Sequence, residues 1–160
     1  MQSEGEATAK RIEVSVEGQL LRIFEGADEV CAYPISTSKF GTGSEEGSYR
    51  TPLGQFIIDE KIGDGAPEGT IFRSRKPEGH WSPDAPECED LGDLVLSRVL
   101  WLSGLEEQNA NTKERYIYIH GTNHEHLLGT PESMGCVRMA NADVIELFDR
   151  IDVGTAMSIE

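Results

Sequence analysis

The clearest pattern in the chain is an alternation of apolar and polar residues near its N-terminus, which has the period of a half-buried β-strand. Ile12, Val14 and Val16 alternate with polar residues, and Gly18 then marks a turn into a second apolar run. Similar short runs recur along the chain, separated by turn-forming residues. The pattern predicts strands at 12–16, 20–24, 30–36, 56–58, 95–102, 116–120 and 156–159.

One segment has the spacing of an amphipathic helix instead. Val144, Leu147, Phe148 and Ile151 recur at helical intervals, and Asn141 precedes them as a candidate N-cap. Strands of this number with a single helix predict a mainly β fold. We expect a β-sandwich or curled mixed sheet with a short helix in the C-terminal region.

The segment 61–90 departs from both patterns, because it holds four glycines and four prolines in thirty residues. It is expected to be a long irregular connection, either a lid over a functional site or an insertion. Residues 1–10 are expected to form a flexible polar lead-in. Residues 11–160 are then expected to form one domain.

Composition narrows the possible functions. A chain of 160 residues can bury roughly two-thirds of its unfolded surface, so it needs no metal or disulfide to fold. The net charge of −15 argues against nucleic acid as a partner, because phosphates would be repelled. No run of eighteen apolar residues predicts a membrane span, and the first residues lack the pattern of a signal peptide.

The candidate chemistry centres on Cys136, one of three cysteines with Cys31 and Cys88. Cys31 lies within a predicted strand and fits an ordinary packed thiol. Cys136 follows Gly135 and stands two residues before Arg138, in a segment rich in turn-forming residues. A thiol on a glycine-containing turn near a cation can react as a thiolate, so Cys136 is a candidate nucleophile.

A thiol nucleophile needs a base that is held in place. His120 ends a predicted strand sixteen residues before Cys136, and Gly121 follows it. A loop of that length can fold back and bring the two side chains together. A purely structural histidine explains the same position equally well.

Two further interpretations of the thiol compete with the nucleophile. His120, His124, His126 and Cys136 could form a zinc site, although His124 and His126 lie in a polar loop without an evident acidic partner. Alternatively, Cys88 could form a disulfide with Cys31 or with Cys136, which would silence that thiol as a nucleophile.

Several motifs together resemble the L,D-transpeptidases of the YkuD type. The segments IHGTN at 119–123 and SMGCVRMAN at 133–141 resemble the signature of this family. SYRTPLGQFII at 48–58, LVLSRVLWLSGLE at 94–106 and RYIYIHGT at 115–122 extend the resemblance over most of residues 12–152. The resemblance implies a β-rich catalytic domain over residues 11–160.

The resemblance also assigns roles to individual residues. Cys136 corresponds to the nucleophile, and His120 to the general base, oriented through the backbone carbonyl of Gly121. Backbone N–H groups at Gly135 and Cys136 are expected to stabilise the oxyanion. Met134 departs from the pattern, because many members carry histidine there. The implied substrate-binding residues are Ser133, Met134, Gly135, Arg138 and Asn141.

The activity implied by the resemblance is transpeptidation of peptidoglycan stem peptides. The thiol would form a thioester with a tetrapeptide stem, release the terminal D-alanine and pass the acyl group to an amine. The alternatives are an L,D-carboxypeptidase that hydrolyses the same bond and a non-catalytic domain that binds wall peptides. The resemblance further implies inhibition by carbapenem-type compounds and a periplasmic or secreted location in the cell envelope. It implies that no metal or organic cofactor is needed.

Overall fold

A computed structural model describes residues 9–84 and 92–160, and these residues form ten strands, one α-helix and two short 3-10 helices. The strands belong to a single mixed sheet. Their bounds are β1 Lys10–Ser15, β2 Leu20–Glu25, β3 Asp28–Ser36, β4 Gly54–Ile62, β5 Thr70–Arg73, β6 Lys76–His80, β7 Leu96–Gly104, β8 Tyr118–Gly121, β9 Val137–Met139 and β10 Ala156–Ile159. The helices are η3 Glu107–Asn109, η4 Glu125–Leu127 and α1 Asn141–Arg150.

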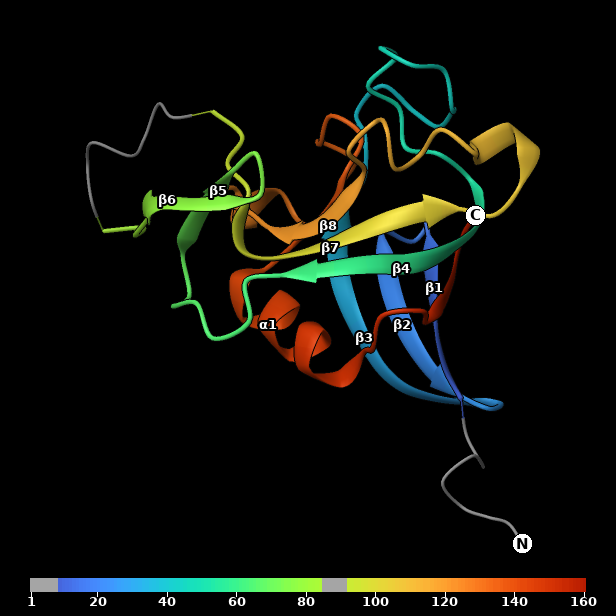
Figure 1. The fold of residues 1–160 in the computed structure, drawn as a ribbon, viewed down its shortest axis with the longest axis horizontal. Helices are drawn as coiled ribbons and strands as arrows, with labels where there is room; N and C mark the ends of the chain where they lie inside the picture. Colours follow the sequence, from blue (N-terminus) through green and yellow to red (C-terminus); the bar gives the residue numbers. More distant parts are fainter. Residues whose placement is uncertain (1–8, 85–91) are drawn as a thin grey trace, which may run out of the picture.

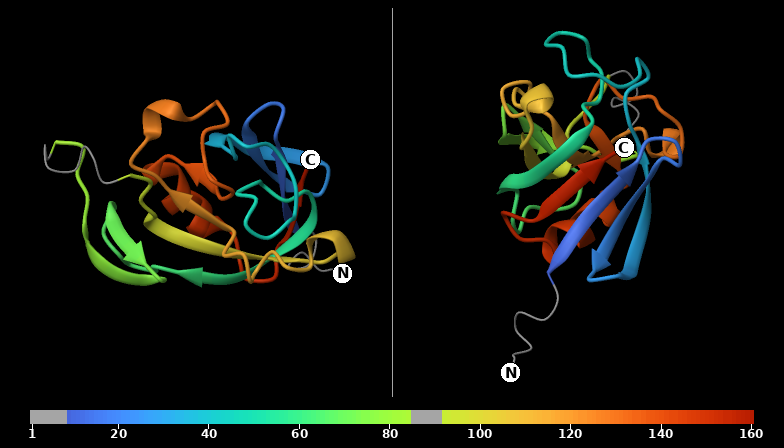
Figure 2. Two further views of the ribbon diagram at one scale, coloured as in Figure 1. Left: turned by 90° about the horizontal axis from the view of Figure 1, so that it is seen from above. Right: turned by 90° about the vertical axis from the view of Figure 1, so that its right-hand side faces the viewer.

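The sheet curls until it closes on itself. Its strand order is β4-β10-β1-β2-β3-β9-β8-β7-β5-β6, and β4 also pairs with β7. Eight strands therefore form a ring, from which the β5–β6 hairpin extends beyond β7. The β1–β10 and β8–β9 pairs are parallel, and the other pairs are antiparallel. Figure 2 shows the hairpin reaching out on the side away from β1.

The core fills the inside of this ring. Alternate residues of the strands point inward, so that Ile12 and Val14 of β1 meet Phe56 and Ile58 of β4 in one apolar cluster. The helix α1 lies against β7 and β8 and adds its apolar face to the same cluster. Figure 1 shows α1 below β4 and β7, and the loop between β3 and β4 above them. Each fully buried aliphatic side chain stabilises the folded state by about 1.5–3 kcal/mol relative to leaving it exposed to water.

The predicted fold class is confirmed, and so are the strands that carry apolar alternation. The prediction for the last strand matches β10 residue for residue. Other boundaries move by a few residues: β4 is longer than the predicted 56–58, and β8 begins at Tyr118 rather than at residue 116. Within residues 9–84 and 92–160, no helix is long and apolar enough to cross a membrane.

Two sequence-based expectations are wrong. The segment 61–90 is not irregular throughout, because β4 continues to Ile62 and the β5–β6 hairpin occupies much of the remainder. The residues of β6 are all exposed, so backbone pairing rather than apolar alternation defines this strand. The N-cap of α1 is Ala140 and not Asn141, which is the first residue of the helix. Of the expected lead-in at residues 1–10, Lys10 already belongs to β1, and residues 1–8 lie outside the described residues, as does Cys88.

Candidate active site

The parallel pair β8–β9 brings the two sequence motifs together. Ile119 of β8 lies opposite Val137 of β9, and His120 lies opposite Arg138. Opposite residues of neighbouring strands point to the same face of a sheet, and successive residues alternate between faces. Ile119 and Val137 point into the core. Cys136, which immediately precedes β9, therefore shares the outer face with His120.

The Cys136 thiol is partly exposed and is held by the backbone of the segment leading into β8. Its Sγ donates to the Tyr116 carbonyl at 3.4 Å and accepts the Tyr118 N–H at 3.3 Å. It also packs beside a small apolar cluster that contains Phe72 and Tyr118. Burial raises the pKa of Cys136 to about 11, while the Tyr118 N–H acts in the opposite direction. The raised pKa favours the protonated thiol at neutral pH.

His120 is buried and has one fixed ring nitrogen. Its Nδ1 lies 2.6 Å from the carbonyl oxygen of Gly121. A carbonyl oxygen only accepts hydrogen bonds, so Nδ1 carries the proton and Nε2 of the neutral ring keeps its lone pair. Burial lowers the pKa of His120, which favours this neutral form. The ring is thus poised to accept a proton at Nε2.

No hydrogen bond within the described chain joins Cys136 to His120. Cys136 precedes β9, so it lies diagonally from His120 across the parallel β8–β9 pair. The Cys136 thiol, now turned toward the Tyr116 carbonyl, must rotate about its Cα–Cβ bond to meet the imidazole. Side-chain rotations of this kind take place within nanoseconds at exposed positions.

Gly121 permits no side chain at its position. A Cβ added there would lie 2.4 Å from Asn141 Oδ1 and 2.7 Å from the carbonyl oxygen of Leu96. The absence of a side chain lets β7, β8 and the start of α1 approach one another. The carbonyl that orients His120 is therefore fixed by close packing on two sides.

The turn before Cys136 is closed by side-chain hydrogen bonds. Ser133 Oγ donates to the Cys136 carbonyl at 2.7 Å and accepts the Gly135 N–H at 3.2 Å. Gly135 has a φ of +124°, a conformation that side chains disfavour. The Ser133 hydroxyl is therefore used within the turn. Of the two N–H groups expected to stabilise an oxyanion, that of Gly135 is already occupied.

Thr51 is a residue of this site that the sequence did not reveal. Its buried hydroxyl donates to the Gly135 carbonyl at 3.0 Å and accepts the Ser38 N–H at 3.0 Å. It thus ties the cysteine turn to the loop between β3 and β4. In sequence, Thr51 stands out only as part of the SYRTPLGQFII resemblance, and nothing there shows that its side chain reaches a residue 84 positions away.

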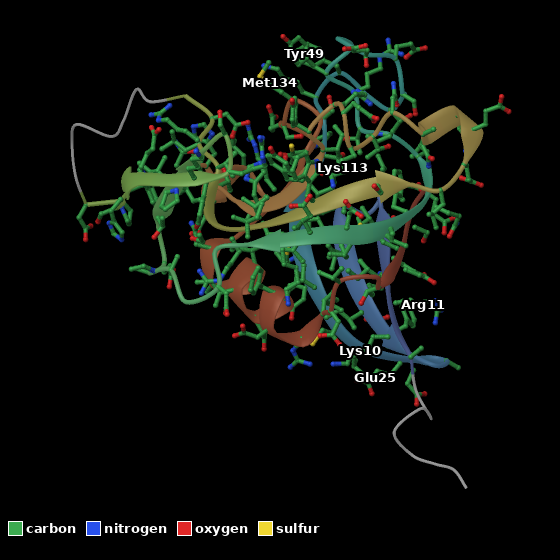
Figure 3. The ribbon with its side chains drawn as sticks, in the orientation of Figure 1. Lys10, Arg11, Glu25, Tyr49, Lys113 and Met134 are labelled. Atoms are coloured by element: carbon green, nitrogen blue, oxygen red, sulfur yellow. The ribbon has the colours of Figure 1, made fainter. Side chains whose placement is uncertain are left out.

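Met134 is exposed on the outside of the turn, with 44% of its surface accessible. Figure 3 shows it beside Tyr49, at the end of the molecule opposite Lys10 and Glu25. Tyr49 is also exposed and lies near the ring of Phe40, with the two centroids 6.0 Å apart. Where many family members carry histidine, this chain thus has an apolar side chain exposed on the turn.

Arg138 is buried beneath the outer face and not presented to solvent. Its Nη2 lies 3.0 Å from Asp93 Oδ2, and the side chain is 4% exposed. Its Nε and Nη1 are buried and have no hydrogen-bond partner within the described residues. In this arrangement the Arg138 guanidinium is held by the Asp93 carboxylate.

Asn141 joins three segments through its side-chain amide. Its Oδ1 accepts a hydrogen bond from Ser97 Oγ at 2.6 Å, and its Nδ2 donates to the Thr122 carbonyl at 2.9 Å. The carboxylate of Glu125 accepts from both the side chain and the backbone N–H of Asn141. All of these contacts are internal, so the amide links β7, the end of β8 and α1.

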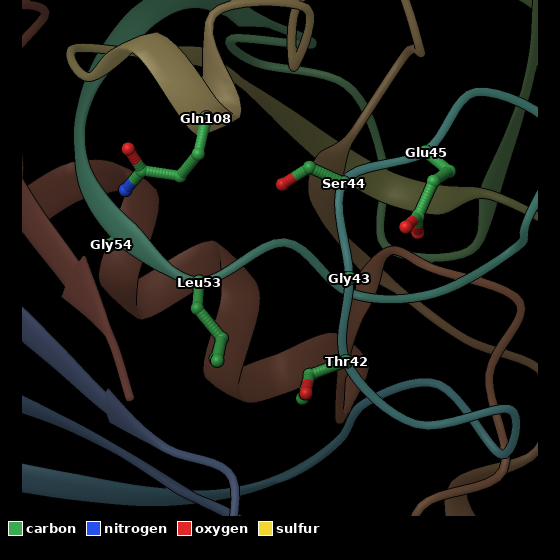
Figure 4. A pocket seen from close by; sticks show the side chains of 7 residues that line it. All are labelled: Thr42, Gly43, Ser44, Glu45, Leu53, Gly54 and Gln108. Atoms are coloured by element: carbon green, nitrogen blue, oxygen red, sulfur yellow. The ribbon is translucent and has the colours of Figure 1, made fainter.

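A separate cavity of about 540 Å³ lies beside the loop between β3 and β4 (Figure 4). Neither Cys136 nor His120 lines it. The cavity is connected to the cysteine turn through Thr42, which pairs with Thr51. Its lining residues are Thr42, Gly43, Ser44, Glu45, Leu53, Gly54 and Gln108.

The competing interpretations of the thiol can be compared with the structure. Cys31 and Cys136 are both free thiols, and Cys88 lies outside the described residues. His124 and His126 face each other with ring centroids 6.0 Å apart. In residues 9–84 and 92–160, no group of three or more side chains is arranged to hold a metal ion.

The structure thus places a partly exposed thiol and a buried imidazole on the same face of the β8–β9 pair. The family model for the L,D-transpeptidase catalytic domain, YkuD, matches residues 9–159. The chain belongs to this family. It is 30% identical to a Bacillus licheniformis protein that carries the name L,D-transpeptidase YkuD, over 93% of this chain and 64% of that protein. The chain thus spans less than two thirds of this relative.

Solved structures share the fold at low sequence identity. An L,D-transpeptidase from Mycobacterium smegmatis superposes with a TM-score of 0.63 at 13% identity, over 96% of this chain and 59% of that one. L,D-transpeptidase 3 from Mycobacterium tuberculosis, in complex with a faropenem-derived adduct, has a TM-score of 0.59 at 15% identity, over 96% of this chain and 60% of that one. These similarities establish the fold.

Proposed function

We propose that the chain is a peptidoglycan L,D-transpeptidase that uses Cys136 as nucleophile and His120 as general base. The observation that carries the proposal is the fixed imidazole. Nδ1 of His120 is bound to the Gly121 carbonyl, which leaves Nε2 free to accept a proton on the face that Cys136 shares. Membership of the L,D-transpeptidase family supports this choice of reaction. Because the substrate is wall peptide, the proposal places the protein in the cell envelope, periplasmic or secreted.

In the first half-reaction, the Cys136 thiol rotates toward His120 and transfers its proton to Nε2. The sulfur forms a bond to the carbonyl carbon that joins the third stem residue, a diamino acid, to the terminal D-alanine. The Cys136 N–H stabilises the oxyanion, and such a donor lowers the activation free energy by about 3 kcal/mol. The C–N bond breaks, and the imidazolium returns the proton to the departing amine of D-alanine.

In the second half-reaction, an acceptor amine attacks the thioester and gives its proton to His120. The C–S bond breaks, and the sulfur recovers the proton, so the enzyme ends as it began. Water in place of the amine would give a carboxypeptidase. A pair that is neutral at rest suits this sequence, because each proton moves only as a bond to carbon is made or broken.

The proposal includes acylation of Cys136 by carbapenem-type inhibitors. The faropenem-derived adduct of the Mycobacterium tuberculosis relative supports this expectation, because a β-lactam ring is opened by the same kind of attack. Incubation with a carbapenem should add the inhibitor's mass to the intact wild-type protein. Cys136→Ala should show no adduct, and Cys31→Ala, the matched control, should react as wild type does.

Absence of an adduct on the wild type, or an adduct that persists on Cys136→Ala, would remove Cys136 as the nucleophile. A second experiment separates transfer from hydrolysis. The protein is incubated with a disaccharide tetrapeptide, and the products are separated by mass. Cross-linked dimers indicate transpeptidation, whereas the tripeptide alone indicates a carboxypeptidase. An unchanged substrate indicates a domain that only binds wall peptides.

A further inference from the structure

The tip of the β5–β6 hairpin holds an arginine in a specific backbone conformation. Ser74 and Arg75, the two residues between the strands, have φ values of 49° and 66°. Two consecutive residues at positive φ are typical of the tight hairpin turn that matches the twist of antiparallel strands. Neither residue is glycine, so the hairpin carries a long cationic side chain at a position where glycine would be easier.

The Arg75 guanidinium is seated on aromatic rings. Its Cζ lies 4.7 Å from the ring centroid of Trp101 and 5.2 Å from that of Tyr116. Its Nη1 donates to the Tyr118 hydroxyl at 3.1 Å. The rings also contact each other, with centroids 5.8 Å apart for Trp101–Tyr116 and 5.6 Å for Trp101–Tyr118. Stacking and the hydrogen bond together fix the plane of the guanidinium.

The same two tyrosines hold the proposed nucleophile. Tyr116 accepts the thiol hydrogen of Cys136 through its carbonyl, and Tyr118 donates its N–H to the sulfur. Arg75 therefore contacts the side chains of the two residues whose backbone surrounds the reacting atom. A ligand group bound by Arg75 would therefore lie at the aromatic side chains of the segment that holds Cys136, where a peptide positioned on Cys136 can reach it.

Arg75 has no acidic partner within residues 9–84 and 92–160. Acidic residues outnumber basic ones by 29 to 14, so a partly exposed arginine would be expected to find a carboxylate. Arg73, on the same hairpin, pairs with Glu78 at 3.3 Å. The negative charge of Glu60 acts on the Arg75 guanidinium. The Glu60 carboxylate is bound, however, by the Lys113 ammonium at 2.7 Å. Nε and Nη2 of Arg75 make no hydrogen bond in this part of the chain.

We propose that Arg75 is a specificity-determining residue that binds a carboxylate of the acyl-donor peptide. The planar fork of a guanidinium matches a carboxylate with two parallel hydrogen bonds. The identity of the ligand as a donor peptide rests on the proposed function. The carboxylate is either the C-terminal one of the leaving residue or an acidic side chain of the peptide, and both present the same chemistry to Arg75.

The test compares three donor peptides: one with all carboxylates free, one amidated at the C-terminus and one amidated at the acidic side chain. On the wild type, one of the amides should lower kcat/KM about ten- to hundredfold, chiefly through KM, because a charge-assisted hydrogen bond is lost. The amide that lowers it identifies the carboxylate. Arg75→Gln should abolish the preference, and Arg75→Lys should retain part of it. Arg73→Gln, the matched control, should discriminate as the wild type does.

Binding of the same peptides to Cys136→Ala, measured by calorimetry, keeps the test independent of turnover. Loss of the acid-over-amide preference in the double variant Cys136→Ala, Arg75→Gln would support the proposal. An unchanged preference in a variant whose circular dichroism is that of the wild type would overturn it. The proposed function fails separately if the wild type turns over none of the three peptides and forms no Cys136-dependent adduct. In that case the binding measurement still decides the role of Arg75.

Discussion

The protonation state of Cys136 at rest is open to a direct test. Burial raises the pKa of the thiol to about 11 and lowers that of His120, so both groups are neutral at pH 7. Alkylation by iodoacetamide requires the thiolate, and its rate therefore follows the thiolate fraction. The assay is this rate as a function of pH, on a protein in which Cys31 and Cys88 are replaced by serine.

The two possible states of the pair differ by a large factor. With a pKa of about 11, the thiolate fraction and the alkylation rate rise tenfold per pH unit, or about a thousandfold between pH 7 and pH 10. An ordinary thiol with a pKa of about 8.5 would gain only about thirtyfold over the same range and level off above pH 9. A thiolate–imidazolium pair at rest would react at a nearly constant rate from about pH 5 upward.

The control is His120→Gln, which removes the base and keeps a polar side chain. If the pair is neutral at rest, His120→Gln leaves the alkylation profile unchanged but abolishes transpeptidation. Circular dichroism at each pH verifies that the protein stays folded. A plateau in the rate between pH 5 and pH 8, lost in His120→Gln, would refute the neutral pair.

Two further predictions concern the packing around the thiol. Thr51→Val should lower the free energy of unfolding in urea by about 2–4 kcal/mol, because the Ser38 N–H and the Gly135 carbonyl lose their buried partner. Thr51→Ser should lower it by only about 1 kcal/mol for the lost methyl group, and equal losses would show that the hydroxyl bridge contributes nothing. Gly121→Ala should lower the free energy of unfolding, measured by thermal unfolding, by about 1–3 kcal/mol and reduce turnover, because the new methyl group would lie 2.4 Å from Asn141 Oδ1. Unchanged stability of this variant would contradict the close packing.

The parts of the fold that the sequence predicts are those in which side chains determine the structure. β1 and β10 each have one face in the core, so apolar residues occupy every second position: Ile12 and Val14 in β1, and Met157 and Ile159 in β10. The helix α1 is equally legible, because its buried residues recur on one side. In these elements the burial of apolar surface and the local pattern agree.

The rest depends on backbone pairing and distant contacts, which leave no periodic signal. β6 is exposed along its whole length and β9 is only three residues long, so neither shows an alternation that can be recognised. Asn141 resembles an N-cap in sequence, but its amide is used to join Ser97 to Thr122. The motif at 133–141 located the thiol, whereas the contacts of Arg75 required the strands to be placed in space.

The position of β10 has a consequence for the order in which the molecule can be completed. This strand, residues 156–159, is inserted between β1 and β4 and pairs with both. During synthesis, β1 must therefore wait until residues 156–159 have emerged before its second neighbour exists. Until then the sheet has an open seam with unpaired backbone groups on both sides, which other chains can pair with, so the unfinished molecule is prone to aggregate until β10 fills the gap.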